Sequence, residues 1–324
     1  MKIIKLNSNL LGFSFALAAA ALNATIGIFS VLLMNTGLKS NDIAFLKTSI
    51  AFVLLSALLS KKSLHFQYQQ LQYQQLISKD FVSSSNKSSH KRVLGAVAIC
   101  AFLGIFTLFM FETKAYAYGN PANVVVILMA SATISATLFG ALLLKEKVFI
   151  NTIVGVLLAI AGIFVISWTS SVDLTLVLFA TLAGSGYGLF SVLMQRFGLQ
   201  GGIYLTKYLL LFGSLFLFIP FMITFEPVDI SYHSILGLLG LAIFPTILGF
   251  YCTTSALKYL PASKVQVIEL SEPLFAMFFV WLILHEDVTI RFWLGAGLVL
   301  LGILTITKRT KESRACHQLA HLII

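Results

Sequence analysis

The chain has 324 residues, of which 58% are hydrophobic and only 10% are charged, and its mean hydropathy is +0.94. A water-soluble domain of this composition would expose more apolar surface than it could bury, so a soluble fold is excluded and the solvent is lipid. The net charge of +10 would suggest nucleic acid as the partner of a soluble protein, but in a membrane protein it reports topology, and we expect no nucleic-acid partner.

Ten apolar stretches are each long enough, at roughly 20 residues, to cross a bilayer core of about 30 Å. Unpaired backbone is not tolerated in hydrocarbon, and the stretches are too long for barrel strands and do not alternate. We therefore predict an all-α membrane protein with ten transmembrane helices. They span residues 10–34, 43–60, 93–113, 121–144, 149–168, 174–195, 203–224, 234–257, 262–284 and 291–307.

The chain opens with Met1-Lys-Ile-Ile-Lys5 and an alanine-rich apolar run, which is also the pattern of a secretory signal peptide. Further along this run, Gly27-Ile-Phe-Ser-Val-Leu32 matches Gly188-Leu-Phe-Ser-Val-Leu193 at an offset of 161. A segment that recurs later in the chain belongs to the mature fold, so we interpret the run as the first transmembrane helix.

A longer repeat supports this interpretation. Residues Pro121–Ile166 align with Pro261–Ile306 without a gap at an offset of 140, with 16 identities in 46 columns. Each half holds five predicted helices, an odd number, so the second half must cross the membrane in the opposite sense. Inverted repeats of this kind let many secondary transporters build a midplane site that opens to either side.

The repeats divide the chain into three predicted regions: a first repeat in 1–168, a second in 169–307 and a basic tail in 308–324. The change of offset from 161 to 140 places about 21 extra residues in the polar segment 61–92, since flexible insertions are tolerated in loops. This segment is either a regulatory or lipid-contacting loop or a tolerated flexible insertion, and its polar composition favours the second interpretation.

Basic residues are distributed unevenly across these loops. If the N-terminus is cytoplasmic, 17 of the 22 Lys and Arg residues fall on the cytoplasmic side. The positive-inside rule then places both termini in the cytoplasm of a bacterial inner membrane.

Cysteine and histidine give little indication of a metal or cofactor. Cys100, Cys252 and Cys316 are not placed to form a structural disulfide. His317 and His321 lie one helical turn apart near Cys316, but this short tail has no second ligand cluster, which argues against a metal site. Phosphate-binding, hydrolase and zinc-protease motifs are missing from the sequence, so we expect no cofactor and no enzyme activity.

One motif occurs once in each half: Leu142-Leu-Leu-Lys-Glu146 with Gly155 and Gly162, and Leu282-Ile-Leu-His-Glu286 with Gly295 and Gly302. These paired halves resemble the ten-helix EamA branch of the drug/metabolite transporter superfamily, over essentially the whole chain outside segment 61–92 and the tail. The resemblance implies an inner-membrane carrier with a central cavity, often an exporter of amino acids or other small metabolites and sometimes driven by protons.

The predicted helix 262–284 contains the residues that are most costly in lipid. Ionised acids at a helix centre cost about 2.5–3.5 kcal/mol or more, so Glu269 and Glu272 are expected to face a pathway. Gln266, Glu269 and Pro273 share one face of a helix, and Glu272 lies about 60° away from Glu269. Pro273 lacks a backbone donor and gives the helix a place to bend. We predict that Glu269 binds an ammonium group or a coupling proton; alternatively, Glu272-Pro273 is a structural kink.

Three further polar residues are candidates for the substrate site. Asn23 aligns with Gly184 of the second repeat and either orients a substrate or bonds a neighbouring helix. Tyr187 lies between glycines in the middle of its predicted helix and is expected to supply an amphipathic wall. Tyr251 is a weaker candidate for the same role.

Other charged residues have two interpretations. Glu112 and Lys114, beside Tyr116 and Tyr118, either close an outer gate or anchor the chain at the membrane interface, and tyrosines at headgroup depth favour anchoring. Lys47 either attracts an anionic substrate or extends its ammonium to the membrane surface, which is the default for lysine near a helix end.

The repeated motif also has a structural interpretation. Glu146 precedes a predicted helix, where an acid complements the helix dipole. Gly155, Gly162, Gly295 and Gly302 place small residues on one helix face and predict either helix packing or a contact within a homodimer.

Together these features predict a secondary transporter that moves a small polar metabolite, such as an amino acid, outward by alternating access, with proton coupling left open. The alternatives are an importer or exchanger of a larger metabolite, a lipid-carrier flippase, or a membrane-embedded enzyme or accessory factor.

Overall fold

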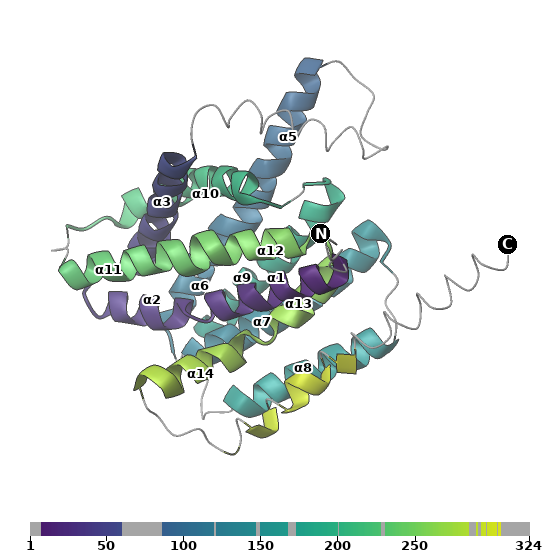
Figure 1. Ribbon diagram of the computed structural model, residues 1–324. Helices are drawn as coiled ribbons and strands as arrows, with labels where there is room; N and C mark the ends of the chain where they lie inside the picture. The colour runs from purple at the N-terminus through teal and green to yellow at the C-terminus, as the bar shows by residue number, and fades with distance from the viewer. Residues whose placement is uncertain are drawn as a thin grey trace, which may run out of the picture.

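The computed structural model is a bundle of helices, and the residues it describes include no strand (Figure 1). Within the part of the chain that the structure describes, seven helical segments are long and apolar enough to cross a membrane. The predicted all-α, multi-pass membrane fold is therefore confirmed. The structure describes residues 8–59, 86–119, 121–146, 150–167, 173–199, 201–227, 231–284, 290, 293–295, 297–302 and 304–305.

Most helix bounds agree closely with those predicted from hydropathy. The helices are α1 (Ser8–Asn23), α2 (Ile26–Met34), α3 (Ser40–Leu58), α5 (Asn86–Ala101), η1 (Phe102–Thr107), α6 (Leu108–Tyr116), α7 (Pro121–Leu144), α8 (Ile150–Ser167), α9 (Leu174–Arg196), α10 (Ile203–Thr224), α11 (Tyr232–Leu241), η2 (Ala242–Gly249), α12 (Phe250–Ala256), α13 (Ala262–Glu269) and α14 (Glu272–Leu284). Two shorter apolar helices, Ile150–Gly162 and Trp293–Gly302, fall in the fifth and tenth predicted spans.

Several features predicted from the sequence fall on other parts of the chain. Residues 61–85, which make up most of the predicted insertion, lie outside the described residues, as do Glu286 and the tail with Cys316, His317 and His321. Cys100 and Cys252 are both buried free thiols. Among the described residues, no group of His, Cys, Asp and Glu is arranged to hold a metal ion.

The first predicted helix, 10–34, is not continuous. It is interrupted between α1 and α2, at Ala24 and Thr25. The Thr25 hydroxyl donates a 2.7 Å hydrogen bond to the carbonyl of Leu22, and such side-chain bonds compete with the helical backbone ladder. The prediction of one unbroken helix is therefore wrong at this point.

Two other spans change helix type partway. The third predicted helix runs through α5, η1 and α6, and the eighth runs through α11, η2 and α12. Both η1 and η2 are π-helical. In each, a threonine hydroxyl donates to the carbonyl five residues earlier, Thr107 to Phe102 at 2.9 Å and Thr246 to Leu241 at 2.7 Å. π-helical turns inside α-helices are uncommon and are frequently found at functional sites.

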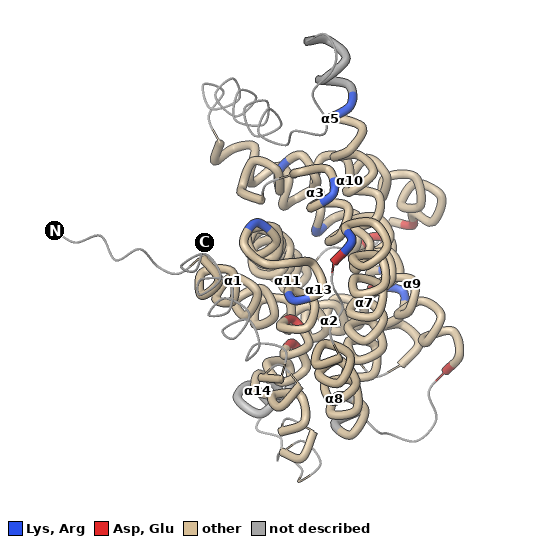
Figure 2. Tube along the Cα trace, turned by 90° about the vertical axis from the view of Figure 1, so that its right-hand side faces the viewer, with Lys and Arg blue, Asp and Glu red and all other residues tan. Residues whose placement is uncertain are grey.

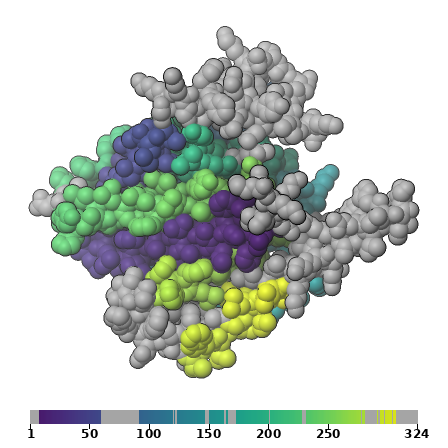
Figure 3. Space-filling model, in the orientation of Figure 1, coloured from purple at the N-terminus to yellow at the C-terminus, as the bar shows by residue number. Residues whose placement is uncertain are grey.

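The helices lie in layers (Figure 1). In that view α3, α5 and α10 form the upper part, and α10 packs against α3, α5 and η1. On the near face, α1 and α2 form a purple band between the green of α11 and α12 and the yellow-green of α13 and α14 (Figure 3). Behind this band α9 lies along α7, the most extensive helix pair of the fold. α1 contacts both α12 and α13 and so joins the first and last parts of the chain.

The outer surface of the bundle is apolar, as a lipid-facing surface requires. Leu58, Leu142 and Ile223 are each more than 60% exposed. Charged positions are sparse along the helices, and acidic positions occur within the bundle beside α13 and α14 (Figure 2). An ionisable side chain inside such a bundle is a candidate for function.

Four glycines hold α8 against the helix Trp293–Gly302. A Cβ on Gly162 would lie 2.5 Å from the carbonyl oxygen of Gly295, and a Cβ on Gly302 would lie 2.5 Å from the carbonyl oxygen of Gly155. The offset of 140 relates Gly155 to Gly295 and Gly162 to Gly302, so it converts each of these two contacts into the other. The glycines therefore serve helix packing within the chain.

Candidate functional site

The candidate site is built around the interruption between α13 and α14. The predicted helix 262–284 is interrupted at Leu270 and Ser271. The amide of Ser271 turns back to the carbonyl of Ile268 at 3.0 Å instead of continuing the α-helical pattern. Pro273 has no N–H to donate to the carbonyl of Glu269, four residues earlier, which explains why the helix stops there. The expected bend is confirmed, but its form is a full interruption.

The interruption leaves Glu269 at the end of α13, fully buried among hydroxyl groups. The Thr253 hydroxyl of α12 donates to its Oε1 at 2.7 Å, and the Tyr187 hydroxyl of α9 donates to its Oε2 at 2.9 Å. The oxygens of Tyr187 and Thr253 are themselves 3.0 Å apart. Three helices thus bring three oxygen-bearing groups into one closed set of contacts, which we call the Glu269 cluster.

Gln266 extends the Glu269 cluster by one helical turn. Its Nε2 donates to Oε2 of Glu269 at 3.3 Å and to the hydroxyl of Ser191 at 3.0 Å. Its Oε1 has no hydrogen-bond partner within the described part of the chain, although it is buried. An unsatisfied buried amide oxygen costs about 1–3 kcal/mol. Gln266 therefore has an acceptor available for a further donor.

The position of α9 depends on its glycines. A Cβ on Gly184 would lie 2.1 Å from the carbonyl oxygen of Leu128, and one on Gly188 would lie 2.3 Å from the carbonyl oxygen of Ala132, both in α7. Tyr187 lies between these two glycines in the sequence. The close packing of α9 on α7 therefore fixes the position of Tyr187 relative to α13. Gln195 of the same helix accepts from the amide of Ala262 at 3.1 Å, which ties α9 to the start of α13.

Glu272 begins α14 and is only 2% exposed. Its Oε2 lacks a hydrogen-bond partner among the described residues. It interacts electrostatically with Glu269 and with Glu112 of α6, both of the same charge. Glu272 therefore lies within electrostatic range of both the Glu269 cluster and a second buried group of charges.

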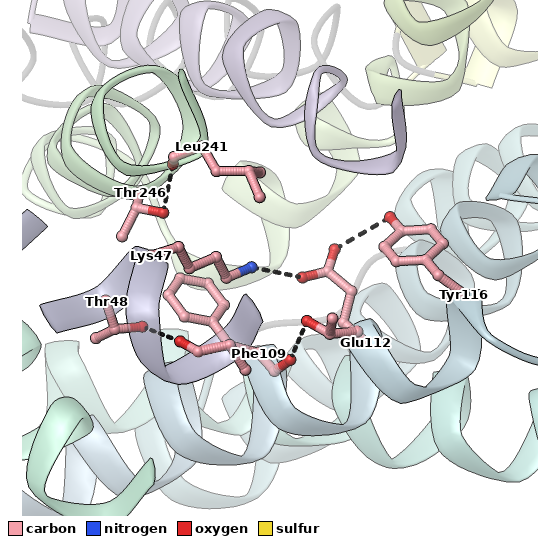
Figure 4. Close-up of polar contacts among 9 residues, drawn as sticks. Lys47, Thr48, Phe109, Glu112, Tyr116, Leu241 and Thr246 are labelled. Carbon is pink, nitrogen blue, oxygen red and sulfur yellow. Dashed lines mark hydrogen bonds and ion pairs between the residues drawn. The ribbon is translucent and has the colours of Figure 1, made fainter. Parts of the chain in front are cut away.

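That second group joins α3 to α6 (Figure 4). The Nζ atom of Lys47 lies 3.9 Å from Oε2 of Glu112 and 4.1 Å from the centre of the Phe109 ring. The Tyr116 hydroxyl approaches Oε1 of Glu112 at 3.3 Å. Lys47 is fully buried and Glu112 is 3% exposed. We call Lys47 and Glu112 the Lys47–Glu112 pair, and Phe109 and Tyr116 are its aromatic neighbours.

This burial corrects two expectations from the sequence. Lys47 does not extend its ammonium to the membrane surface, because its side chain is enclosed between α3 and α6. Glu112 and Tyr116 do not anchor the chain at the membrane interface, because they contact one another inside the bundle. The sequence contained no spacing signal that pairs the second predicted helix with the third.

The remaining predicted site residues lie apart from the Glu269 cluster. Asn23 ends α1, and its Oδ1 is so close to Gly249 that a Cβ there would approach it to 2.3 Å. Tyr251 points its ring at Phe15, with 6.0 Å between the ring centres. The structure thus brings Tyr187, Gln266 and Glu269 together but leaves Asn23 and Tyr251 at the contact between α1 and the η2–α12 segment.

Thr253 and Ser191 were missed in the sequence. Both are fully buried and both bond to a predicted site residue. A single hydroxyl in an apolar helix is too common to stand out, although Ser191 does belong to the segment that repeats Gly27–Leu32. Only the packing of α9 and α12 against α13 distinguishes them from other hydroxyls.

Glu146 lies outside the membrane-spanning segments and stabilises a different helix from the one expected. Its Oε2 accepts from the Ser263 hydroxyl at 2.8 Å, in the first turn of α13. Burial raises the pKa of the Glu146 carboxyl above its ordinary value of 4.5, and the hydrogen bond from Ser263 opposes that rise. The acid still sits at a helix N-terminus, but that of α13, where it helps to position the candidate site.

Comparison with known proteins finds one transporter family and several relatives that are named as transporters. A model of the EamA-like transporter family matches residues 10–168 and 174–308. An uncharacterized transporter of Clostridium kluyveri is 25% identical over 239 residues, 70% of this chain and 76% of the relative. One of Archaeoglobus fulgidus is 28% identical over 213 residues, 64% and 74%. The uncharacterized transporter YvbV of Bacillus subtilis is 25% identical over 223 residues, 67% and 73%.

A solved crystal structure shares the fold. It superposes with a TM-score of 0.68 and covers 94% of this chain and 98% of its own, at 16% sequence identity. At that identity the likeness concerns the path of the backbone and not the residues of the Glu269 cluster.

Proposed function

Because the chain belongs to the EamA-like transporter family, we propose that it is a secondary active transporter that moves a small polar metabolite across the bacterial inner membrane by alternating access. An amino acid or related compound, moved outward, is the favoured cargo, and both termini are placed in the cytoplasm. The transporter names of its relatives support transport over a membrane-embedded enzyme.

The observation that carries the proposal is the set of three mutual oxygen contacts in the Glu269 cluster. The three oxygen contacts among Glu269, Tyr187 and Thr253 need three hydrogen atoms, but the two hydroxyl groups supply only two. With an ionised Glu269, both hydroxyls donate to the carboxylate, and their 3.0 Å contact with each other has no hydrogen.

A third hydrogen completes the ring. If Glu269 carries a proton, it donates to one hydroxyl, which donates to the second, which returns to the other carboxyl oxygen. An ammonium group that donates to Glu269 would supply the missing hydrogen in another way, by releasing one hydroxyl from the carboxylate. The Glu269 cluster is thus suited to exchange one proton or one ammonium group, and a carrier that alternates between these two ligands couples their movements.

Burial of the Glu269 cluster supports alternating access. Tyr187, Gln266, Glu269 and Thr253 are each no more than 1% exposed, so a solute reaches them only after helices separate. The π-helical segment η1 contacts α9 and the π-helical segment η2 contacts α12, the helices of Tyr187 and Thr253, and the interrupted helices α1 and α13 contact each other. Non-helical backbone at such depth is tolerated where protein or a water-filled path covers it, and it gives helices places to bend.

Two relationships support inverted repeats as the basis of that movement. The reciprocal contacts of Gly162 with Gly295 and of Gly302 with Gly155 are those expected from a two-fold axis inside the chain. The π-helical segment Phe102–Thr107, moved by the offset of 140, falls within η2. Two similar halves of opposite orientation exchange their conformations to open the site on one side and then the other.

Transport in membrane vesicles of defined orientation tests the proposal. We expect the purified chain in proteoliposomes to move at least one small polar solute from a panel of amino acids and related metabolites, faster from the cytoplasmic side. Movement in the opposite sense would replace export by import or exchange, and movement of lipid-linked compounds alone would indicate a flippase. If no solute of any class moves, the carrier proposal fails.

A further inference from the structure

The buried interior contains more negative than positive groups. Apart from Asp42, the charged side chains within the described bundle that are less than 5% exposed are Lys47, Glu112, Glu269 and Glu272. Asp42 is also buried, but at the start of α3, where its Oδ2 accepts from the amide of Lys39 at 3.0 Å. The described interior thus holds three carboxyl groups and one ammonium group. Two of the three carboxyl groups therefore have no positively charged partner among the described residues.

The ammonium group of Lys47 is poorly placed to neutralise the carboxylate of Glu112. Its 3.9 Å distance to Oε2 of Glu112 is too long for a hydrogen bond. Neither atom has a hydrogen-bond partner among the described residues. Breaking or loosening a buried ion pair is strongly unfavourable, since each ion has lost its water. The Lys47–Glu112 pair therefore has a donor and an acceptor that are available to hydrogen-bond a further group.

Glu272 offers an acceptor to the same region. Its Oε2 is buried and unpartnered in the described structure. Both Glu272 and Glu112 interact electrostatically with Tyr116, so the tyrosine lies near both acids. Tyr116 donates to Oε1 of Glu112, but Oε2 of each acid has no donor among the described residues, and two buried carboxylates in this position are stabilised by a further cation or a proton.

We propose that Glu272 and Glu112 form a second cation subsite beside the Glu269 cluster, with Lys47 as its resident counter-charge. This subsite takes one further positive charge in the closed state, from a second amino group of the transported molecule or from a proton that accompanies it. The inference rests on the proposed function, because it assumes that the Glu269 cluster binds the first positive charge. It extends the substrate class to small organic cations with two amino groups.

The surroundings of the subsite contain few other titratable groups. Those that face it or the adjoining Glu269 cluster in the described structure are Lys47 from α3, Glu112 and Tyr116 from α6, Tyr187 from α9, Cys252 from α12 and Glu269 from α13. Glu112 and Glu269, together with Glu272, are the carboxyl groups of this region, whereas cysteine and tyrosine ordinarily ionise only above neutral pH.

Ligand-dependent thermal stability of the purified protein tests the subsite without requiring transport. The probes are 1,4-diaminobutane and 1-aminobutane, which differ by one amino group. We expect the diamine to bind the wild type about tenfold or more tightly than the monoamine, since a hydrogen bond to a charged group contributes about 1.5–3 kcal/mol. Glu272→Gln is expected to bind the two amines alike, and Glu272→Asp to restore part of the difference.

If the second charge is a proton, the two amines bind the wild type alike, and one proton more is taken up per bound amine by the wild type than by Glu272→Gln. Glu226→Gln, a change in the exposed ion pair with Lys39, is the control in both arms. The subsite is disproved if neither the diamine preference nor the proton uptake depends on Glu272, with Glu112→Gln giving the same result should Glu272→Gln fail to fold. Absence of transport in vesicles would instead disprove the proposed function.

Discussion

The Tyr187 hydroxyl lies 2.9 Å from Oε2 of Glu269 and donates a hydrogen bond to it, although the two residues are 82 positions apart in the chain. Their contact joins α9 of the second predicted repeat to the point where α13 ends. It is the most direct link between a predicted wall of the pathway and its predicted charge.

Tyr187→Phe removes this hydroxyl and keeps the ring, which stacks on Phe190 at 6.1 Å between centres. We expect the apparent affinity for the transported solute to fall about tenfold, since hydrogen bonds to charged groups contribute about 1.5–3 kcal/mol. Concentration-dependent uptake into proteoliposomes measures this. Tyr251→Phe is the matched control and should leave uptake unchanged, because that ring contacts Phe15 instead. Equal effects of the two variants would contradict our account of the site.

Pro273→Ala restores a backbone donor opposite the carbonyl of Glu269. We expect the interruption at Leu270 and Ser271 to close partly into a continuous helix. In a helix interior, proline is less favourable than alanine by about 3 kcal/mol. Transport should slow several-fold while the melting temperature is kept or raised. Comparing solute uptake with thermal unfolding in detergent checks both parts. A variant that transports as the wild type does would show that the interruption is dispensable.

Gly162→Ala and Gly302→Ala should destabilise the protein by similar amounts. Each added Cβ would meet a backbone atom of the facing helix at about 2.5 Å, and overpacking of this kind costs about 1–3 kcal/mol. Thermal unfolding in detergent measures the effect. Gly297→Ala is the control within the same helix, where an added Cβ meets nothing within 4 Å. A large effect at one of the two glycines and none at the other would contradict the internal two-fold relationship.

Glu146→Gln should change how stability depends on pH. Since burial raises the pKa of Glu146 above 4.5 in the folded state, the stability that its protonated form contributes is present below 4.5 and is lost as the pH rises through the folded value. Between about pH 4 and about pH 8, the melting temperature of the wild type should therefore fall relative to that of Glu146→Gln as the pH increases. A constant difference across this range would argue against the raised pKa.

Hydropathy predicted the extent of the helices because length and apolar composition are local properties. α7 and α10 have the same bounds as the predicted helices 121–144 and 203–224. The high cost of acids in lipid likewise identified Glu269, and Pro273 identified where its helix would bend. Both signals are visible in one short segment of sequence.

Features that depend on distant contacts were not predicted. The interruption at Thr25 and the π-helical segments carry local hydrogen bonds from threonine hydroxyls, but a single hydroxyl in an apolar helix is too common to predict them. Lys47 and Glu112 each have an ordinary explanation as interfacial residues, and only the packing of α3 on α6 shows that they meet. Thr253 became a site residue only because α12 lies beside α13.

Solute uptake as a function of pH, by wild type and by Glu269→Gln in proteoliposomes, tests the central claim most directly. The uncharged amide cannot exchange a proton or hold an ammonium group as a carboxylate does. We predict that Glu269→Gln slows uptake at least about tenfold, as expected from the loss of a charged partner, and abolishes its pH dependence, while Glu226→Gln retains both. Uptake by Glu269→Gln at the wild-type rate and with the wild-type pH dependence would contradict the claim.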